Sequence, residues 1–150
     1  MKPSHLSMMI AFAVAGPLAT PSARAASPGA CKLLTPAEVG SVVGATMAVG
    51  PSVNGPTSSS CEWKQQGGGV TVIVTAKSLD AFQKGKTILS PAPVSGIGDE
   101  AYQTGNSLSY TALSARRGQN AITVSVRGLK DVSAVQAAEK AIGKIAVTRL

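Results

Sequence analysis

The chain is poor in the side chains that most enzyme mechanisms use: it has one histidine, two cysteines and only 3% aromatic residues. The single histidine, His5, lies in a segment whose pattern predicts its removal on export, so we expect a mature chain without imidazole. Serine and cysteine hydrolases need that group, and zinc or copper sites usually use histidine or free cysteine. We therefore expect no enzymatic activity, no cofactor and no metal site.

The first residues have the pattern of an export signal. Lys2 supplies a positive charge, residues 6–15 form a short apolar run, Gly16 and Pro17 break it, and small residues occur at positions 23 and 25. A bilayer span needs roughly 20 apolar residues, so the alternative of an uncleaved anchor is less favoured. No later run is long enough to span a membrane after processing.

This pattern predicts the organisation of the chain. We expect cleavage near Ala25 and Ala26 and a final location in the periplasm or outside the cell. The predicted parts are a signal peptide (residues 1–25), a flexible lead (residues 26–30) and a single domain (residues 31–150).

Removal of the leader leaves 12 basic and 7 acidic residues, a net charge of about +5. Such a surface attracts anionic partners, such as lipid headgroups or other anionic envelope components. With so few aromatic residues a stacking platform for nucleic acid is not expected. Arg116, Arg117 and Arg127 are the candidate contacts to an anionic partner, and the alternative is an ordinary solvated hairpin end.

Cys31 and Cys61 are expected to form a disulfide, because thiols pair in oxidising compartments. The alternative is lipidation of Cys31, which follows the small residues Gly29 and Ala30. Pro28 stands where an aliphatic residue is wanted, which favours the disulfide. Trp63 shares a strand face with Cys61 by the period of two, so we expect a core position for the indole rather than a ligand-stacking one.

Helix signals occur in three places along the chain. Thr35, Pro36 and Glu38 form a capping pattern that predicts a short helix ending near Gly44. Ser78 is expected to cap a middle helix, which Gly85 weakens. Apolar residues spaced by three or four predict a long helix over residues 131–149.

Alternating apolar and polar residues predict strands between the helices. Residues 61–64 and 70–75 are expected to form a hairpin around three glycines, with residues 50–60 as a loop before it. Further strands are predicted around residues 101–103, around Leu108, Tyr110 and Ala112 facing the core, and over residues 122–126. The fold class is α+β: a single antiparallel sheet packed with an N-terminal, a middle and a long C-terminal helix, and one disulfide.

Several short patterns could carry chemistry, and each has a simpler explanation. Residues 96–100, Gly-Ile-Gly-Asp-Glu, could hold a phosphate or a cation, but no helix is expected to follow, which favours a tight turn before a strand. Ser95 with Lys84 or Lys86 lacks the spacing of a serine-lysine pair. A carboxylate pair for glycoside hydrolysis would have to come from four acidic residues: Asp80, Asp99, Glu100 and Asp131. The sequence does not give the distances between them, on which such a mechanism depends.

Three motifs occur in an order that resembles a known group of proteins. They are Cys-x-Leu-Leu-Thr at residues 31–35, Cys-x-Trp at 61–63 and Gly-x-Gly-Asp-Glu-Ala at 96–101. The chain resembles small exported bacterial domains of unknown function, often lipoproteins, over most of residues 31–149. The resemblance implies an α+β sandwich with one disulfide, similar to the extrinsic photosystem proteins, and no catalytic residues.

These observations together predict a non-enzymatic envelope protein that binds another protein or an anionic envelope component. The alternative is an inhibitor or immunity-type protein that blocks a periplasmic or secreted enzyme with a loop such as residues 50–60. A small hydrolase that uses carboxylates is the third possibility.

Overall fold

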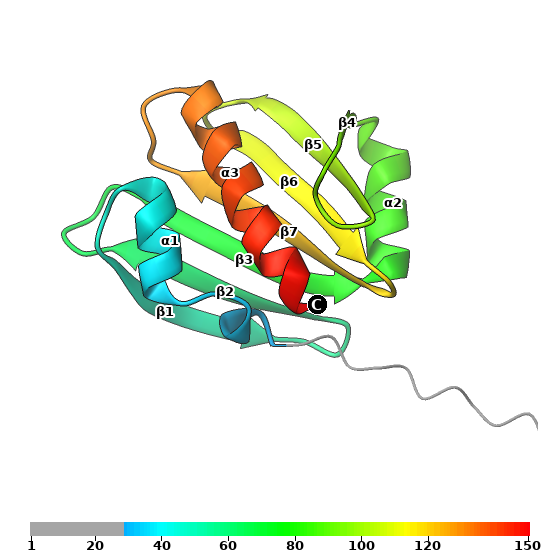
Figure 1. Ribbon diagram of the computed structural model, residues 1–150, viewed down its shortest axis with the longest axis horizontal. Helices are drawn as coiled ribbons and strands as arrows, with labels where there is room; N and C mark the ends of the chain where they lie inside the picture. The colour runs from blue at the N-terminus through cyan, green and yellow to red at the C-terminus, as the bar shows by residue number, and fades with distance from the viewer. Residues whose placement is uncertain (1–28) are drawn as a thin grey trace, which may run out of the picture.

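The computed structural model describes residues 29–150 and contains one seven-stranded antiparallel sheet with three α-helices (Figure 1). The predicted α+β fold is confirmed. The strands are β1 (Met47–Asn54), β2 (Ser58–Gln65), β3 (Thr71–Ser78), β4 (Ala92–Val94), β5 (Glu100–Ser107), β6 (Tyr110–Arg117) and β7 (Asn120–Arg127). The helices are α1 (Pro36–Val43), α2 (Leu79–Leu89) and α3 (Val132–Ala146), with the short 3-10 turns η1 (Ala30–Lys32) and η2 (Val147–Arg149). The predicted signal peptide lies outside the described residues.

The sheet consists of two meanders that meet at its centre. The strand order is β1-β2-β3-β7-β6-β5-β4, and every neighbouring pair is antiparallel. The chain passes from the central strand β3 through α2 to the edge strand β4 and then returns strand by strand to β7. The pairing of β3 with β7 therefore joins the two halves of the domain.

The helices lie on both faces of the sheet but cover them unequally. Helices α1 and α3 lie on one face, over the main core (Figure 1). Ile122 of β7 points into this core, whereas its neighbour Ala121 packs with Phe82 of α2 and Tyr102 on the other face. We call the side that carries α1 and α3 the helical face.

Helix α1 begins and ends as the sequence predicts. The Thr35 side chain accepts a hydrogen bond from the Glu38 backbone N–H, and the Glu38 carboxylate accepts one from the Thr35 backbone, so the capping box is complete. Gly44 follows the helix with a φ of 70°, in the left-handed region that glycine adopts without strain.

A disulfide joins Cys31 of η1 to Cys61 of β2, as predicted. The Cys31 sulfur is therefore not available for lipidation in this form of the protein. Trp63, two residues further along β2, is fully buried in the same core cluster, which confirms its predicted core position. The disulfide thus attaches the N-terminal end of the domain to the sheet beside its largest buried side chain.

Two expectations about the strands are wrong. Residues 50–60 are not one loop, because β1 continues to Asn54 and β2 begins at Ser58, so that only a short turn connects a hairpin. Leu108 and Tyr110 do not face the core: they are 49% and 54% exposed, and Leu113 and Ala115 are buried instead. A shift of one residue in strand register moves every side chain of the strand to the opposite face. The β5–β6 turn sets the register of β6, and the alternation pattern in the sequence did not reveal the position of this turn.

Gly85 has a packing role inside α2. A Cβ at this position would lie 2.6 Å from the Tyr102 hydroxyl oxygen. The Tyr102 hydroxyl donates a 3.1 Å hydrogen bond to the Phe82 backbone carbonyl. The centroids of the Phe82 and Tyr102 rings lie 4.8 Å apart. The glycine that weakens the isolated helix therefore permits its contact with the sheet.

Among the described residues, no helix is both long and apolar enough to cross a membrane. The disulfide is consistent with an oxidising compartment outside the cytoplasm.

Reduction of the disulfide should destabilise the domain substantially. The bond closes a loop of 30 residues, for which chain entropy predicts a loss of about 3–4 kcal/mol from the free energy of unfolding. Urea denaturation of the wild type and of the Cys31→Ser/Cys61→Ser double variant measures this loss. The non-reduced protein should also lack free thiols, and titration of two thiols per chain would contradict the structure.

Candidate binding face

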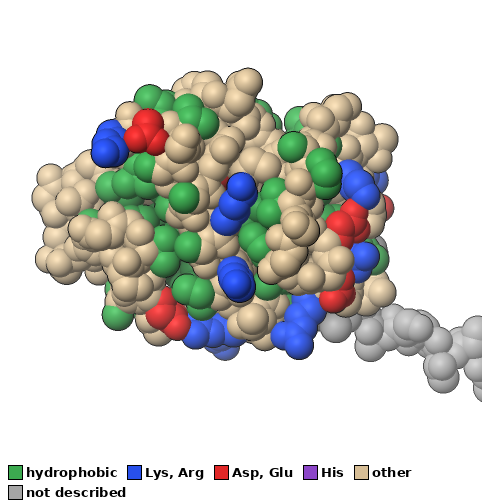
Figure 2. Space-filling model, turned by 45° about the horizontal axis from the view of Figure 1, so that its top comes forward, with side chains coloured by type: hydrophobic (Ala, Val, Ile, Leu, Met, Phe, Trp, Pro, Cys, Tyr) green, Lys and Arg blue, Asp and Glu red, His purple; other side chains and the backbone are tan. Residues whose placement is uncertain are grey.

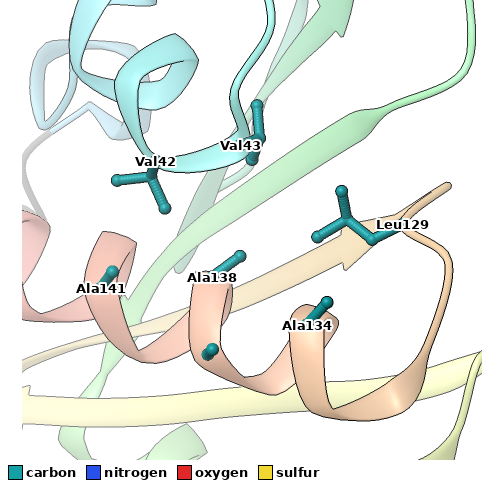
Figure 3. Close-up of a pocket in the computed structure, with 7 residues that line it drawn as sticks. Val42, Val43, Leu129, Ala134, Ala138 and Ala141 are labelled. Atoms are coloured by element: carbon teal, nitrogen blue, oxygen red, sulfur yellow. The ribbon is translucent and has the colours of Figure 1, made fainter.

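An open apolar groove lies between α1 and α3. Its volume is about 420 Å³, within the range of small-molecule sites. Val42 and Val43 form one side of it and alanines of α3 the other, with Leu129 from the β7–α3 loop at one end (Figure 3). All of its lining side chains are aliphatic: Val42, Val43, Leu129, Ala134, Ala137, Ala138 and Ala141.

The groove lies on a face that carries excess positive charge. Lys130 follows Leu129 in the loop, and Lys140 and Lys144 are exposed on α3 beside the groove-lining alanines. Within residues 29–150, no acidic side chain forms an ion pair with any of these three lysines. In Figure 2, Lys and Arg side chains lie between hydrophobic patches on this side of the molecule.

The acidic residues of the helical face are occupied by other contacts. Glu38 pairs with Arg149, Asp131 caps α3 by accepting a 2.7 Å hydrogen bond from the Ala134 N–H, and Glu139 is fully buried. Elsewhere these acidic residues form ion pairs: Glu62 with Lys64, Asp80 with Lys84, Asp99 with Arg116, and Glu100 with Lys86 and Arg116. Four bases outside the groove also have no acidic partner in the described chain: Lys32, Lys77, Arg117 and Arg127. Three of the seven unpaired bases within residues 29–150 therefore lie beside the groove: Lys130, Lys140 and Lys144.

The C-terminal end of the chain is held against α1 by an ion pair. Both terminal guanidinium nitrogens of Arg149 donate hydrogen bonds to the Glu38 carboxylate, and one of them, Nη1, also donates a 2.7 Å hydrogen bond to the Leu33 carbonyl. The hydrogen bond from Arg149, together with those from Thr35, lowers the pKa of Glu38 to about 2. A bidentate contact of this kind orients as well as attracts, so it contributes to the placement of α1 beside α3.

A buried carboxylate lies under α3. Glu139 is 0% exposed and accepts hydrogen bonds from Gln103 Nε2 at 2.6 Å, Thr111 Oγ1 at 2.7 Å and the Val126 N–H at 3.2 Å. These three partners belong to β5, β6 and β7, so one side chain connects α3 to three strands. Burial outweighs the hydrogen bonds and raises the pKa of Glu139.

The three candidate arginines do not lie together. Arg116 and Arg117 are neighbours on β6, so they point to opposite faces of the sheet. Arg116 pairs with Asp99 and Glu100, whereas Arg117, on the helical face, donates a 2.8 Å hydrogen bond to the Thr148 carbonyl. Arg127 ends β7 at the far end from these two, beside Thr71.

Residues 96–100 form a turn before β5. Gly98 has a φ of 61°, and a Cβ there would lie 2.3 Å from the Arg116 carbonyl oxygen, so only glycine fits without a shift. Asp99 accepts a 2.7 Å hydrogen bond from the Gly118 N–H, and Glu100 binds Arg116 and Lys86. These contacts support the interpretation of the motif as a turn.

The other candidate residues for chemistry lie apart or in structural contacts. Lys84 and Lys86 bind Asp80 and Glu100, and no hydrogen bond joins either lysine to Ser95 within the described chain. Lys77 instead lies near a serine, with 3.4 Å between its Nζ and Ser114 Oγ. Ser114 is only 3% exposed, so this pair is poorly placed to meet a substrate.

Sequence reasoning missed Glu139 and the groove. Glu139 occupies a core position in the helical period, four residues after Val135 and three before Ile142, and that placement was a usable signal for a buried acid. The groove has no comparable signal, because its two sides come from α1 and α3, nearly a hundred residues apart.

No protein-family model matches the chain, and no curated protein or solved structure shows significant similarity to it.

We expect Glu139→Leu to destabilise the fold strongly and Glu139→Gln to change its stability only slightly. Leucine would leave three buried donors without an acceptor, at about 1–3 kcal/mol each, whereas glutamine keeps an acceptor oxygen and removes the charge. Because the pKa of Glu139 is raised on folding, its stabilising contribution is present below pH 4.5 and is lost as the pH rises through the folded value.

Glu139→Gln should therefore gain stability relative to the wild type between pH 4 and pH 8. Urea denaturation at several pH values measures the difference in unfolding free energy. A difference that stays constant over this range would contradict the assignment of a raised pKa.

The Glu38–Arg149 pair should change the stability with pH in the direction opposite to Glu139. The pKa of Glu38 is lowered from 4.5 to about 2, so its stabilising contribution is present above pH 4.5 and is lost as the pH falls toward 2. The melting temperature of Glu38→Gln should therefore fall less steeply than that of the wild type as the pH is lowered from 5 to 2. NMR titration of the Glu38 carboxyl measures its pKa directly. A pKa near the ordinary value of 4.5 would contradict the Glu38–Arg149 ion pair.

Proposed function

We propose that the protein is an exported, non-enzymatic binding module of the cell envelope that binds an anionic envelope component through its helical face. The supporting observation is the asymmetry of charge. Four bases without an acidic partner within residues 29–150 lie on the helical face, Lys130, Lys140, Lys144 and Arg117, against Lys77 and Arg127 on the other face. Unpaired cations on one face attract an anionic surface and orient the protein toward it.

This proposal changes the expected contact residues. Arg117 lies on the helical face and remains a candidate contact, near the C-terminal end of α3. Arg116 is engaged by Asp99 and Glu100, and Arg127 lies on the other face of the sheet. The lysines of α3, which the sequence analysis did not single out, are better placed than either.

The location belongs to the same proposal. The N-terminal export pattern and the disulfide both support a periplasmic or secreted protein. The resemblance to small exported domains without known catalytic residues supports a binding role over an enzymatic one.

Binding to anionic vesicles tests the proposed function. At low ionic strength the protein should sediment with vesicles of phosphatidylglycerol and phosphatidylcholine but not with pure phosphatidylcholine. Each lysine near such a surface contributes about 1 kcal/mol, so Lys140→Gln/Lys144→Gln should weaken binding by about 30-fold. High salt should abolish the effect, because it screens exposed charges.

The matched control is Lys64→Gln/Lys84→Gln, which removes the same net charge away from the groove, from lysines that pair with Glu62 and Asp80. This control should retain most of the binding. Equal losses in both double variants would show that net charge alone is responsible, and no binding at low salt would refute the proposed function.

A further inference from the structure

We propose that the groove between α1 and α3 binds the aliphatic chain of an anionic amphiphile, whose charged head contacts Lys144 and Lys140. This inference rests on the proposed function and adds the chemical class of the ligand. It combines two features that lie side by side on the helical face: an exposed groove lined only by aliphatic side chains and a pair of lysines without acidic partners among residues 29–150.

The lysines are placed to meet the head of a chain that lies in the groove. Lys144 follows Ala141 by three residues and Ala137 by seven, so it continues the row of α3 side chains at the edge of the groove. Lys140 lies one turn before it on the same exposed side. Leu129 lies at the other end of the groove, where the exposed Lys130 follows it in the loop.

The size of the groove favours a thin ligand. One turn of an α-helix is about 5.4 Å long and about 10–12 Å across, which corresponds to roughly 400–600 Å³. The groove is open and has a volume of about 420 Å³, so it could enclose no more than about one such turn, and a longer helix would contact it with one face only. An unbranched aliphatic chain is much narrower, because packed carbon atoms lie only about 4 Å apart.

The chemistry of the lining argues against an extended peptide. Backbone N–H and C=O groups that become buried need hydrogen-bond partners. The side chains that line the groove are Val, Leu and Ala, and they offer a peptide backbone no hydrogen-bond partners. A hydrocarbon chain has no polar groups and incurs no such cost.

Electrostatics argues against a second copy of this protein on the same face. Two copies that met through their helical faces would bring Lys130, Lys140 and Lys144 of one chain toward the same lysines of the other. Like charges repel at close range, whereas an anionic head is attracted.

Dodecanoate is a suitable probe, because it combines a single aliphatic chain with a carboxylate. Calorimetric titration of the purified protein, below the concentration at which the probe forms micelles, should show one bound molecule per chain. Methyl signals of Val42, Val43 and Leu129 should shift during the same titration. Inorganic phosphate, which has the charge but no chain, should not shift them.

Filling the groove tests the position of the ligand. Ala141→Leu places a larger side chain in the groove at an exposed position and should weaken dodecanoate binding at least tenfold. Ala81→Leu makes the same exchange at an exposed position of α2 and should leave binding unchanged. Lys140→Gln/Lys144→Gln should also weaken binding, and thermal melts should show that all variants are folded.

The outcomes separate this inference from the proposed function. Binding to anionic vesicles without binding of dodecanoate would overturn the amphiphile and leave the proposed function standing. Equal binding of dodecanoate by the wild type and Ala141→Leu would overturn the groove as the site. A wild type that dimerises in sedimentation, and an Ala141→Leu variant that does not, would assign the groove to a second copy and overturn the inference.

Discussion

The close packing of α3 on β6 and β7 is the constraint on which the rest of the structure depends. Gly143 permits it, because a Cβ there would lie 2.3 Å from Leu113 Cδ2. Glu139, one turn earlier, adds hydrogen bonds to all three strands beneath the helix. Because α3 lies this close to the sheet, its outer side forms one side of the groove, and Lys140 and Lys144 on it are exposed to solvent.

The N-terminal part of the domain is placed relative to α3 by two separate attachments. The Cys31–Cys61 disulfide joins η1 to β2, and the Glu38–Arg149 pair joins α1 to the end of the chain. Together they hold α1 beside α3 with a groove between the two helices, so the candidate site depends on contacts between residues far apart in sequence. The two buried or paired glutamates respond to acid in opposite directions, because burial raises the pKa of Glu139 whereas Arg149 lowers that of Glu38.

The two faces of the sheet differ in ways that bear on function. On the helical face, apolar side chains remain exposed beside lysines that no described acid neutralises. On the other face, hydroxyl groups pair across strands, as in Ser60 with Thr75 and Ser114 with Thr123, and most charges have partners. A face whose polar groups already bond to one another has less to gain from a ligand than the helical face has.

The sequence by itself determined the fold class, the disulfide, the capping box of α1, the buried Trp63 and the three helices, because these depend on local spacing and on cysteine chemistry. Only the tertiary structure decided the register of β6, the strand character of residues 50–54 and the separation of Arg116 from Arg117 and Arg127. The groove belongs to this second group, because its sides come from helices nearly a hundred residues apart. Local patterns report how a segment folds, whereas a binding face depends on which segments meet and which charges remain unpaired after they do.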